Sequence, residues 1–405
     1  MGNPLIFHVD VNSAFLSWES VYRMNELNDP TDLRLIPSAV GGDQEKRHGV
    51  ILAKSTPAKQ FNIQTGEPIV NALRKCPNLM IVPVRFDIYE MYSKAFIDIL
   101  RTYTPKVEQY SIDEAYMDMT GTQRLYCDPV KTATEIKDRI YNELGFTVNV
   151  GISTNKLLAK MAGDLKKPNL VHTLFPEEIP KKMWPLNVRE LLFVGKATEQ
   201  KLRSLGIHTI GDLACADNNM LIAHLGKQGN MIREFANGID RSQVMTTKSE
   251  PKGYSNSTTI SHDVTDAIEA KKILLSLCET VATRLREDDV CATVVAIQIT
   301  DCYFHNTSHQ MSLMSATNTT NELYKYICEL FDELWDKRTP IRLLGVHTSK
   351  LTKEANQQYN LFDLQTYEKN AKLDHTLDEI RKKFGSSSII RASLLEQNEK
   401  NIKGR

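Results

Sequence analysis

The chain has 405 residues with 50 basic and 50 acidic side chains, so its formal net charge is zero. This length is too great for one hydrophobic core and predicts roughly two to four domains. The hydrophobic share of 41% is that of an ordinary soluble protein, and no run of about 18 apolar residues predicts a membrane-spanning helix. Zero net charge does not exclude a nucleic-acid partner, because the distribution of charge matters more than its sum.

The N-terminus and the cysteines favour the cytoplasm. The stretch MGNPLIFHVDVNSAF lacks a charged segment followed by an apolar one, so no signal peptide is predicted. The seven cysteines include no Cys-x-x-Cys pair and are scattered through periodic segments. We therefore expect reduced, mostly buried thiols and no zinc site.

The first predicted strand ends on an acidic residue. Residues 5–11, LIFHVDV, form a short β-rich run, and residues 13–24 show the apolar spacing of a helix. Asp10 is therefore predicted at the C-terminal end of a strand, at a strand-to-helix turn. In open α/β layers, ligands usually bind at such places.

The following segments extend this strand and helix into a layer that is typical of a split βαββαβ unit. Residues 25–85 contain short strands and many turn residues, and we interpret them as an excursion from the layer. The layer itself is predicted from helices at 86–103, 130–144 and 154–167 and from strands at 106–110, 115–119 and 146–153.

Two adjacent carboxylates, Asp113 and Glu114, lie at the predicted turn within the stretch YSIDEAYMDM. Successive strand residues point to opposite faces, so Asp113 shares a face with Ala115, and Glu114 shares the other face with Tyr116. An unpaired carboxylate in an apolar row is costly, and a bound cation would offset that cost. The alternative is a hairpin tip whose acidic side chains are simply solvated.

The second half of the chain is predicted to form separate domains. Residues 176–240 are helical and compact, whereas 241–255 lack periodicity and contain Pro and Gly, as linkers do. Residues 256–350 again alternate strands and helices. The remaining tail is polar and includes one further predicted helix at 373–384.

Three features together resemble the bacterial Y-family (UmuC/DinB-like) translesion DNA polymerases. They are Asp10 at a strand end, SIDEAY at 111–116, and GISTNKLLAKMAGDLKKPN at 151–169. The resemblance covers almost the whole chain. It implies an α+β multidomain fold with a split βαββαβ palm, inserted fingers, a helical thumb that resembles a helix-hairpin-helix, and a separate α+β little finger. The implied boundaries are palm 1–24 and 86–172, fingers 25–85, thumb 173–240, linker 241–255, little finger 256–350 and tail 351–405.

The resemblance also assigns a catalytic metal site. It implies that Asp10, Asp113 and Glu114, with the carbonyl of Val11, are ligands of two Mg²⁺ ions. Mg²⁺ prefers a few carboxylates plus substrate phosphates, and two such ions clamp the attacking and leaving oxygens of a phosphoryl displacement. In this assignment Asp113 and Glu114 are the catalytic pair.

Other implied contacts concern the incoming nucleotide. Phe15 matches the steric gate, a ring that excludes a 2′-hydroxyl, and packing in the core is the alternative. Thr56 and Lys59 match phosphate-binding positions where DinB-like members have a tyrosine and an arginine, so the geometry of triphosphate binding is open. Lys167 matches the palm lysine near the triphosphate.

Contacts with DNA are implied for the thumb. LLFVGKATEQKL resembles a helix-hairpin-helix, whose turn presents backbone N–H groups to a DNA phosphate, and Gly195 and Lys196 are the implied contacts. Phe193 replaces the first of the two usual glycines, so a plain helix-pair core is the alternative. Lys156 and Lys160 either line the palm surface or lie on a solvated helix face.

The stretch QQYNLFD in the tail resembles the bacterial peptide that binds the sliding clamp. Gln358, Leu361 and Phe362 are the implied contacts, and such a peptide must be exposed to enter a hydrophobic pocket. The alternative is a segment that packs back on the little finger.

Together these features predict a template-directed DNA polymerase that adds a deoxynucleotide to a primer 3′-hydroxyl, with the low fidelity and lesion bypass that the family implies. The expected partners are primer–template DNA, deoxynucleoside triphosphates and a sliding clamp. We expect a nucleoid-associated monomer in the cytoplasm, without membrane contact. The alternatives are a palm-type nucleotidyl cyclase and a catalytically inactive DNA-binding accessory protein on the same fold.

Overall fold

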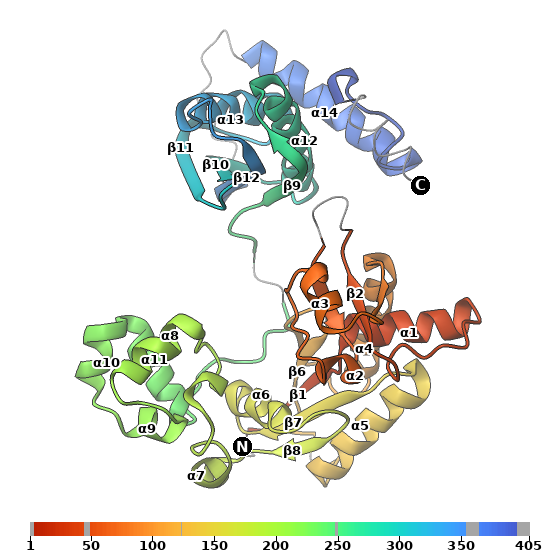
Figure 1. Ribbon diagram of the computed structural model, residues 1–405, viewed down its shortest axis with the longest axis vertical. Coiled ribbons are helices and arrows are strands. Elements are labelled where there is room, and N and C mark those ends of the chain that lie inside the picture. The colour runs from red at the N-terminus through yellow and green to blue at the C-terminus, as the bar shows by residue number, and fades with distance from the viewer. Residues whose placement is uncertain (1–3, 44–48, 123, 248–249, 354–363, 395–405) are drawn as a thin grey trace. The chain divides into compact units, whose positions relative to one another are not determined.

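The computed structural model describes residues 4–43, 49–122, 124–247, 250–353 and 364–394. They form two compact units, one with the described residues up to 247 and one with those from 250 onward (Figure 1). Each unit has a hydrophobic core of its own. Among the described residues, no helix has both the length and the apolar character needed to cross a membrane.

The first unit is built on a five-stranded sheet with the order β5-β6-β1-β7-β8. The central strand β1 pairs antiparallel with β6 and β7, whereas β8 pairs parallel with β7. The predicted layer lacked β8, because three residues are too few to show a periodic pattern. The strands are β1 (Ile6–Val11), β5 (Val107–Gln109), β6 (Glu114–Asp118), β7 (Val148–Ser153) and β8 (Val171–Thr173).

The two faces of this sheet carry different residues. Phe7, Val9 and Met117 are buried on one face, in a core shared with three helices. His8 and Asp10 alternate with them on the opposite face, against which α6 (Lys156–Asp164) packs. The three helices of the core are α1 (Ala14–Glu26), α4 (Phe86–Arg101) and α5 (Pro129–Leu144).

A glycine allows α6 to lie close to the sheet. A side chain at Gly151 would meet the Ala159 carbonyl oxygen at 1.9 Å and the Gly163 backbone nitrogen at 2.4 Å. Strand and helix backbones therefore touch, which only glycine permits. The Asn149 side-chain amide also donates to the Gly163 carbonyl at 3.0 Å. These contacts fix α6 over the face that bears Asp10.

A smaller three-stranded sheet is inserted between α1 and α4. β2 pairs antiparallel with β3 and parallel with β4, and residues such as Ile51 and Ile69 form a separate small core. The insertion lies within residues 25–85, the segment interpreted above as separate from the predicted layer. Its elements are β2 (Ser38–Gly41), β3 (Ile51–Lys54), α2 (Thr56–Lys59), α3 (Ile69–Lys75) and β4 (Met80–Val82).

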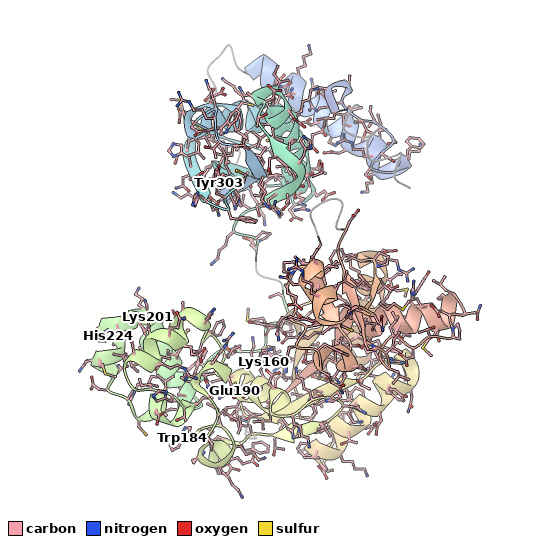
Figure 2. All side chains as sticks on the ribbon, viewed as in Figure 1. Lys160, Trp184, Glu190, Lys201, His224 and Tyr303 are labelled. Carbon is pink, nitrogen blue, oxygen red and sulfur yellow. The ribbon has the colours of Figure 1, made fainter. Side chains whose placement is uncertain are left out.

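Short helices follow β8 and pack around a core of their own, which also contains Leu157 and Leu158 of α6. Trp184, labelled in Figure 2, donates its indole N–H to the Ala236 carbonyl at 3.0 Å and joins the start of this helical region to its end. The elements are η1 (Pro176–Glu178), α7 (Ile179–Lys182), η2 (Val188–Glu190), α8 (Lys196–Ser204), α9 (Ile210–Cys215), α10 (Asn218–Leu225) and α11 (Lys227–Ala236).

The segment predicted as a linker, 241–255, is structured at both ends. The Met245 N–H donates to Glu108 of β5 at 2.7 Å, and Val244 packs beside Tyr116. At the other end, Ser255 already belongs to β9. The linker was predicted because these residues lack hydrophobic periodicity. Periodicity gives no information on strand pairing or on an isolated hydrogen bond such as that of Met245.

The second unit contains a four-stranded antiparallel sheet with the order β11-β10-β12-β9. The helices α12 and α13 pack against it around a second large core. The strand β9 was not predicted, because its sequence SNSTTISHDV is too polar to show an alternation of apolar and polar residues. The elements are β9 (Ser255–Val264), α12 (Ala267–Glu287), β10 (Cys291–Asp301), β11 (Asn306–Thr317), α13 (Thr320–Leu334) and β12 (Ile341–Thr352).

The C-terminal helix α14 (Leu364–Phe384) is part of this unit and begins earlier than the predicted helix at 373–384. Its Asp374 side chain, 3% exposed, accepts a hydrogen bond of 2.7 Å from the Thr320 backbone N–H at the start of α13. Asp374 also pairs with Arg286 of α12 at 3.3 Å and with Arg391 at 3.5 Å. A short turn, η3 (Ala392–Leu394), ends the described chain.

Replacing Asp374 with Ala is expected to destabilise the second unit by about 3 kcal/mol, because it leaves two partly buried arginines without a shared partner. Hydrogen exchange of the full chain should show faster exchange of the amides in α14 and at the start of α13. The matched control is His375→Ala, since His375 is the next residue of α14 and is exposed. Unchanged protection in Asp374→Ala would contradict a structural role for this contact.

Candidate active site

The predicted catalytic carboxylates lie on two neighbouring strands. Asp10 is directly opposite Glu114 in the antiparallel pair of β1 and β6, so both side chains are on the face covered by α6. Asp113 precedes β6, and its carbonyl accepts a hydrogen bond of 3.0 Å from the Val11 N–H. The Asp113 carboxylate accepts a further hydrogen bond of 2.6 Å from the Ser111 hydroxyl. The four residues predicted as ligands are therefore neighbours along the paired backbones of β1 and the start of β6.

Lysines and a histidine compensate the charge of two of these carboxylates. The Lys167 ammonium contacts Asp10, and the Lys160 ammonium of α6 contacts Glu114. His8 Nε2 lies 2.8 Å from the same Glu114 carboxylate. Figure 2 labels Lys160 where α6 lies against the sheet. These ammonium groups provide positive charge at the place where the acidic side chains gather.

The environment moves the pKa values of Asp10 and Glu114 in opposite directions. Burial raises the pKa of Asp10 above its ordinary value, in spite of Lys167. Burial also acts to raise the pKa of Glu114, but hydrogen bonds from His8 and Lys160 outweigh it and lower this pKa to about 2. Glu114 is therefore ionised at neutral pH.

The chemistry of these side chains fits a divalent cation. Three carboxylates supply hard oxygen ligands, and Asp10 is a buried anion that a cation would stabilise. Within the described ranges, no three His, Cys, Asp or Glu side chains are already arranged to hold a metal ion together. Asp113 and Glu114 are instead engaged by Ser111 and Lys160, so metal binding requires these side chains to exchange partners.

Phe15 lies in the first turn of α1, five residues after Asp10. Its half-buried ring stacks on Tyr89 with a centroid distance of 5.0 Å and an interplanar angle of 26°. It also meets Phe86 and Trp18 edge-on, each at 6.0 Å. Packing in the core and a role as steric gate are therefore compatible for Phe15, because one side of the ring packs on the core and part of the residue remains accessible.

The predicted phosphate-binding residues of the inserted sheet are exposed. Thr56 and Lys59 lie at the two ends of α2, whose N-cap Ser55 accepts a hydrogen bond of 3.1 Å from the Ala58 N–H. Burial lowers the pKa of Lys54, and the nearby charge of Lys59 adds to this effect. Two lysines that repel each other in this way favour a bound anion.

Lys167 lies beside two carboxylates, one of which is a predicted metal ligand. Its ammonium pairs with Asp10 and, at 2.9 Å, with Asp164 at the end of α6. Burial acts to lower the pKa of Lys167, but the two carboxylates outweigh it and raise the pKa. Lys167 is therefore positively charged at neutral pH and in reach of any phosphate that approaches Asp10.

The helix-hairpin-helix turn has a side chain where glycine is usual. Phe193 has a φ of +67°, a conformation that costs a non-glycine residue roughly 1–2 kcal/mol. Its ring is 51% exposed and lies 5.9 Å from that of Phe235. Gly195, the N-cap of α8, has open space around it, and Lys196 is exposed. The turn is therefore accessible on the Gly195 side.

His8 was not predicted as a site residue, and the role of Lys160 was open. His8 lies two residues before Asp10 in the same strand, so alternation could have placed both on one face. Lys160 depends on how α6 docks, which the sequence does not reveal. The Lys156 ammonium, by contrast, is paired with Glu108 at 2.8 Å and does not lie on a solvated face.

The predicted clamp-binding residues, Gln358, Leu361 and Phe362, lie outside the described residues.

Comparison with a solved structure identifies the fold. A Y-family DNA polymerase chimera superposes with a TM-score of 0.73 at 23% identity, covering 88% of this chain and 100% of that chain. At this identity the match establishes the fold, and it confirms the predicted α+β multidomain fold class.

Family models and curated relatives then define the family. Residues 9–164 match the impB/mucB/samB family, 176–207 match the IMS family HHH motif, and 251–361 match the impB/mucB/samB family C-terminal domain. The chain is 49% identical over 398 residues to DNA polymerase IV of Clostridium acetobutylicum, which covers 98% of this chain and 100% of that relative. It is 37% identical over 404 residues to DNA polymerase IV 1 of Bacillus subtilis, covering 99% of this chain and 95% of that relative.

The chain therefore belongs to the impB/mucB/samB family. These comparisons confirm the predicted bacterial Y-family resemblance and the predicted enzyme class, a DNA-directed DNA polymerase of the translesion type. Neither the nucleotidyl cyclase nor the inactive accessory protein is favoured.

Proposed function

We propose that this polymerase joins a deoxynucleotide to a primer 3′-hydroxyl at the carboxylates of β1 and β6, with two Mg²⁺ ions as cofactors. The observation that carries the proposal is the placement of Asp10 opposite Glu114, with Asp113 at the adjoining turn. Oxygens of Asp10, Asp113 and Glu114 and the carbonyl of Val11 would hold the ions. When bound, the ions would activate the primer hydroxyl and neutralise charge on the phosphates.

The lysines of the site have a second role in this proposal. Lys167 is paired with Asp10, and Lys160 is paired with Glu114. Where Asp10 held a cation instead, the Lys167 ammonium would be available to pair with the triphosphate as a point charge. Thr56 and Lys59 at the ends of α2 would bind the distal phosphates by one hydroxyl donor and one ammonium. Phe15 would exclude a 2′-hydroxyl from the sugar position.

The remaining parts of the chain would hold primer–template DNA. Gly195 starts α8 with an unobstructed backbone, and Lys196 follows it with an exposed positive charge, which together suit a DNA phosphate. The exposed side chain of Phe193 would restrict the space for a phosphate on one side of this turn. We further propose that the enzyme acts as a monomer in the cytoplasm, in association with the nucleoid.

The proposal is tested by primer extension with undamaged and lesion-containing templates, with Mg²⁺ varied and the products resolved by length. We expect extension by the templated nucleotide that depends on Mg²⁺. Formation of cyclic nucleotide without extension would favour the cyclase. DNA binding without any metal-dependent incorporation would favour the inactive accessory protein.

The clamp contact gives a separate prediction. Leu361 and Phe362 are adjacent apolar residues in a polar stretch, and burying both would contribute roughly 1.5–3 kcal/mol each before ordering costs. Replacing both with Ala should abolish the stimulation that a loaded sliding clamp gives and leave unassisted synthesis on a short primer intact. Loss of clamp-independent activity or of thermal stability would instead show that the segment packs on its own protein.

A further inference from the structure

A buried acidic residue lies one helical turn after Phe15. Glu19 is in α1, and its side chain is 1% exposed. One carboxylate oxygen lies 2.6 Å from Arg85 Nη2 and 3.1 Å from Arg23 Nε. The other oxygen lies 3.1 Å from Arg85 Nε, so Arg85 binds the carboxylate in a bidentate manner.

This ion pair joins the two helices that carry the aromatic side chains around Phe15. Glu19 and Phe15 are four residues apart on α1, which places them on one face of the helix. Arg85 directly precedes α4, and Phe86 and Tyr89 follow it in the first turn of that helix. The pair therefore fixes the start of α4 against the first half of α1.

Tyr89 connects the ion pair to the ring of Phe15. Its fully buried ring stacks on Phe15, and its hydroxyl lies 3.5 Å from Glu19. Burial raises the pKa of Tyr89 to about 12, and the nearby Glu19 charge adds to the rise, so the hydroxyl stays protonated and can donate to Glu19. Tyr89 thus contacts the Glu19 carboxylate through its hydroxyl and the Phe15 ring through its own ring.

We propose that the Glu19–Arg85 pair is a positioning device that holds the Phe15 ring through Tyr89 and thereby determines how strongly the enzyme rejects ribonucleotides. The inference rests on the proposed role of Phe15 as the ring that excludes a 2′-hydroxyl. Steric exclusion depends on the position of one ring surface, so a small displacement relaxes it. Removing one partner of a buried ion pair costs stability, but well-packed apolar residues can often replace the whole pair, so stability alone does not explain why a pair is used here.

The test compares kcat/KM for a deoxynucleotide with kcat/KM for the matching ribonucleotide. Glu19→Gln keeps the shape of the side chain and removes its charge. Arg85→Lys keeps the charge and removes the bidentate geometry, and it serves if the first variant folds poorly. We expect each variant to lower the discrimination ratio by roughly 3- to 10-fold. Glu143→Gln, which breaks an exposed pair with Arg139 on α5, is the matched control and should leave the ratio unchanged.

A variant of Phe15 separates this inference from the function on which it rests. Phe15→Ala should itself relax discrimination, and Glu19→Gln should add nothing in that background if it acts through the ring. An unchanged ratio in Phe15→Ala would contradict the gate. A relaxed ratio in Phe15→Ala, together with unchanged ratios in Glu19→Gln and Arg85→Lys, would leave the gate intact and overturn the positioning role. Fully additive effects would also overturn it.

Discussion

Replacing Asp113 with Asn, or Glu114 with Gln, is expected to lower the rate of nucleotide incorporation by roughly 10²- to 10³-fold or more. Each change keeps the size of the side chain and removes one negative charge from the site that would hold the metal ions. The loss should appear in the chemical step, because the metal ions that these carboxylates would hold stabilise the charge on the reacting phosphate. Single-turnover incorporation of one nucleotide measures it directly, and fluorescence anisotropy with labelled primer–template should show unchanged affinity for DNA.

The matched control for these variants is Asp138→Asn. Asp138 is an acidic residue on α5 of the same unit, it is 57% exposed, and its pair with Lys137 lies on the surface. This variant should incorporate nucleotides at the original rate. Full activity in both Asp113→Asn and Glu114→Gln would remove these two carboxylates from the mechanism.

Replacing Phe15 with Ala is expected to relax the rejection of ribonucleotides by roughly 10- to 200-fold. The half-buried ring rests on Tyr89, so truncation removes a surface that is held in place and leaves space for a hydroxyl. The ratio of kcat/KM values for deoxynucleotide and ribonucleotide measures the effect. Deoxynucleotide incorporation should fall much less than in the carboxylate variants, because no ligand is removed.

Tyr126→Ala is a suitable control for the loss of an aromatic side chain. Tyr126 is partly buried and packs on Tyr103, with a centroid distance of 5.6 Å. Its truncation should reduce stability without altering sugar discrimination. If Phe15→Ala is folded and active but keeps the original discrimination ratio, Phe15 only packs in the core.

The sequence allowed the local arrangement of the site to be predicted where strand alternation determines it. Residues 5–11 were predicted as a strand and form β1 from Ile6 to Val11. Alternation placed Ala115 and Glu114 on opposite faces, and in the structure Ala115 is in the core whereas Glu114 lies on the other face of the sheet. These predictions succeed because a period of two needs no knowledge of the neighbouring elements.

Features that depend on tertiary contacts could not be predicted in the same way. Lys160 reaches Glu114 only because Gly151 lets α6 touch the sheet. The strand β9 is defined by its pairing with β12, and its polar sequence gives no signal. Two of the seven cysteines, Cys127 and Cys215, are exposed, although mostly buried thiols were expected.

The C-terminal region shows the same limitation. The tail was predicted as polar, with a helix at 373–384, and its charged residues gave no sign of docking. In the structure, Asp374 forms hydrogen bonds and ion pairs with Thr320, Arg286 and Arg391, so charged residues hold α14 in place. A charged composition predicts side chains that are exposed to solvent. The ion pairs and hydrogen bonds that allow such side chains to be buried form only when the elements pack together.

The most direct test of the central claim is single-nucleotide incorporation by the full chain on a defined primer–template, with each deoxynucleotide offered separately and Mg²⁺ titrated. The claim is that the carboxylates of β1 and β6 support templated, metal-dependent addition to a primer. We predict preferential addition of the templated nucleotide, a steep requirement for Mg²⁺, and loss of the reaction on chelation and in Asp113→Asn. Incorporation that ignores the template, or that persists at full rate in Asp113→Asn, would contradict this account.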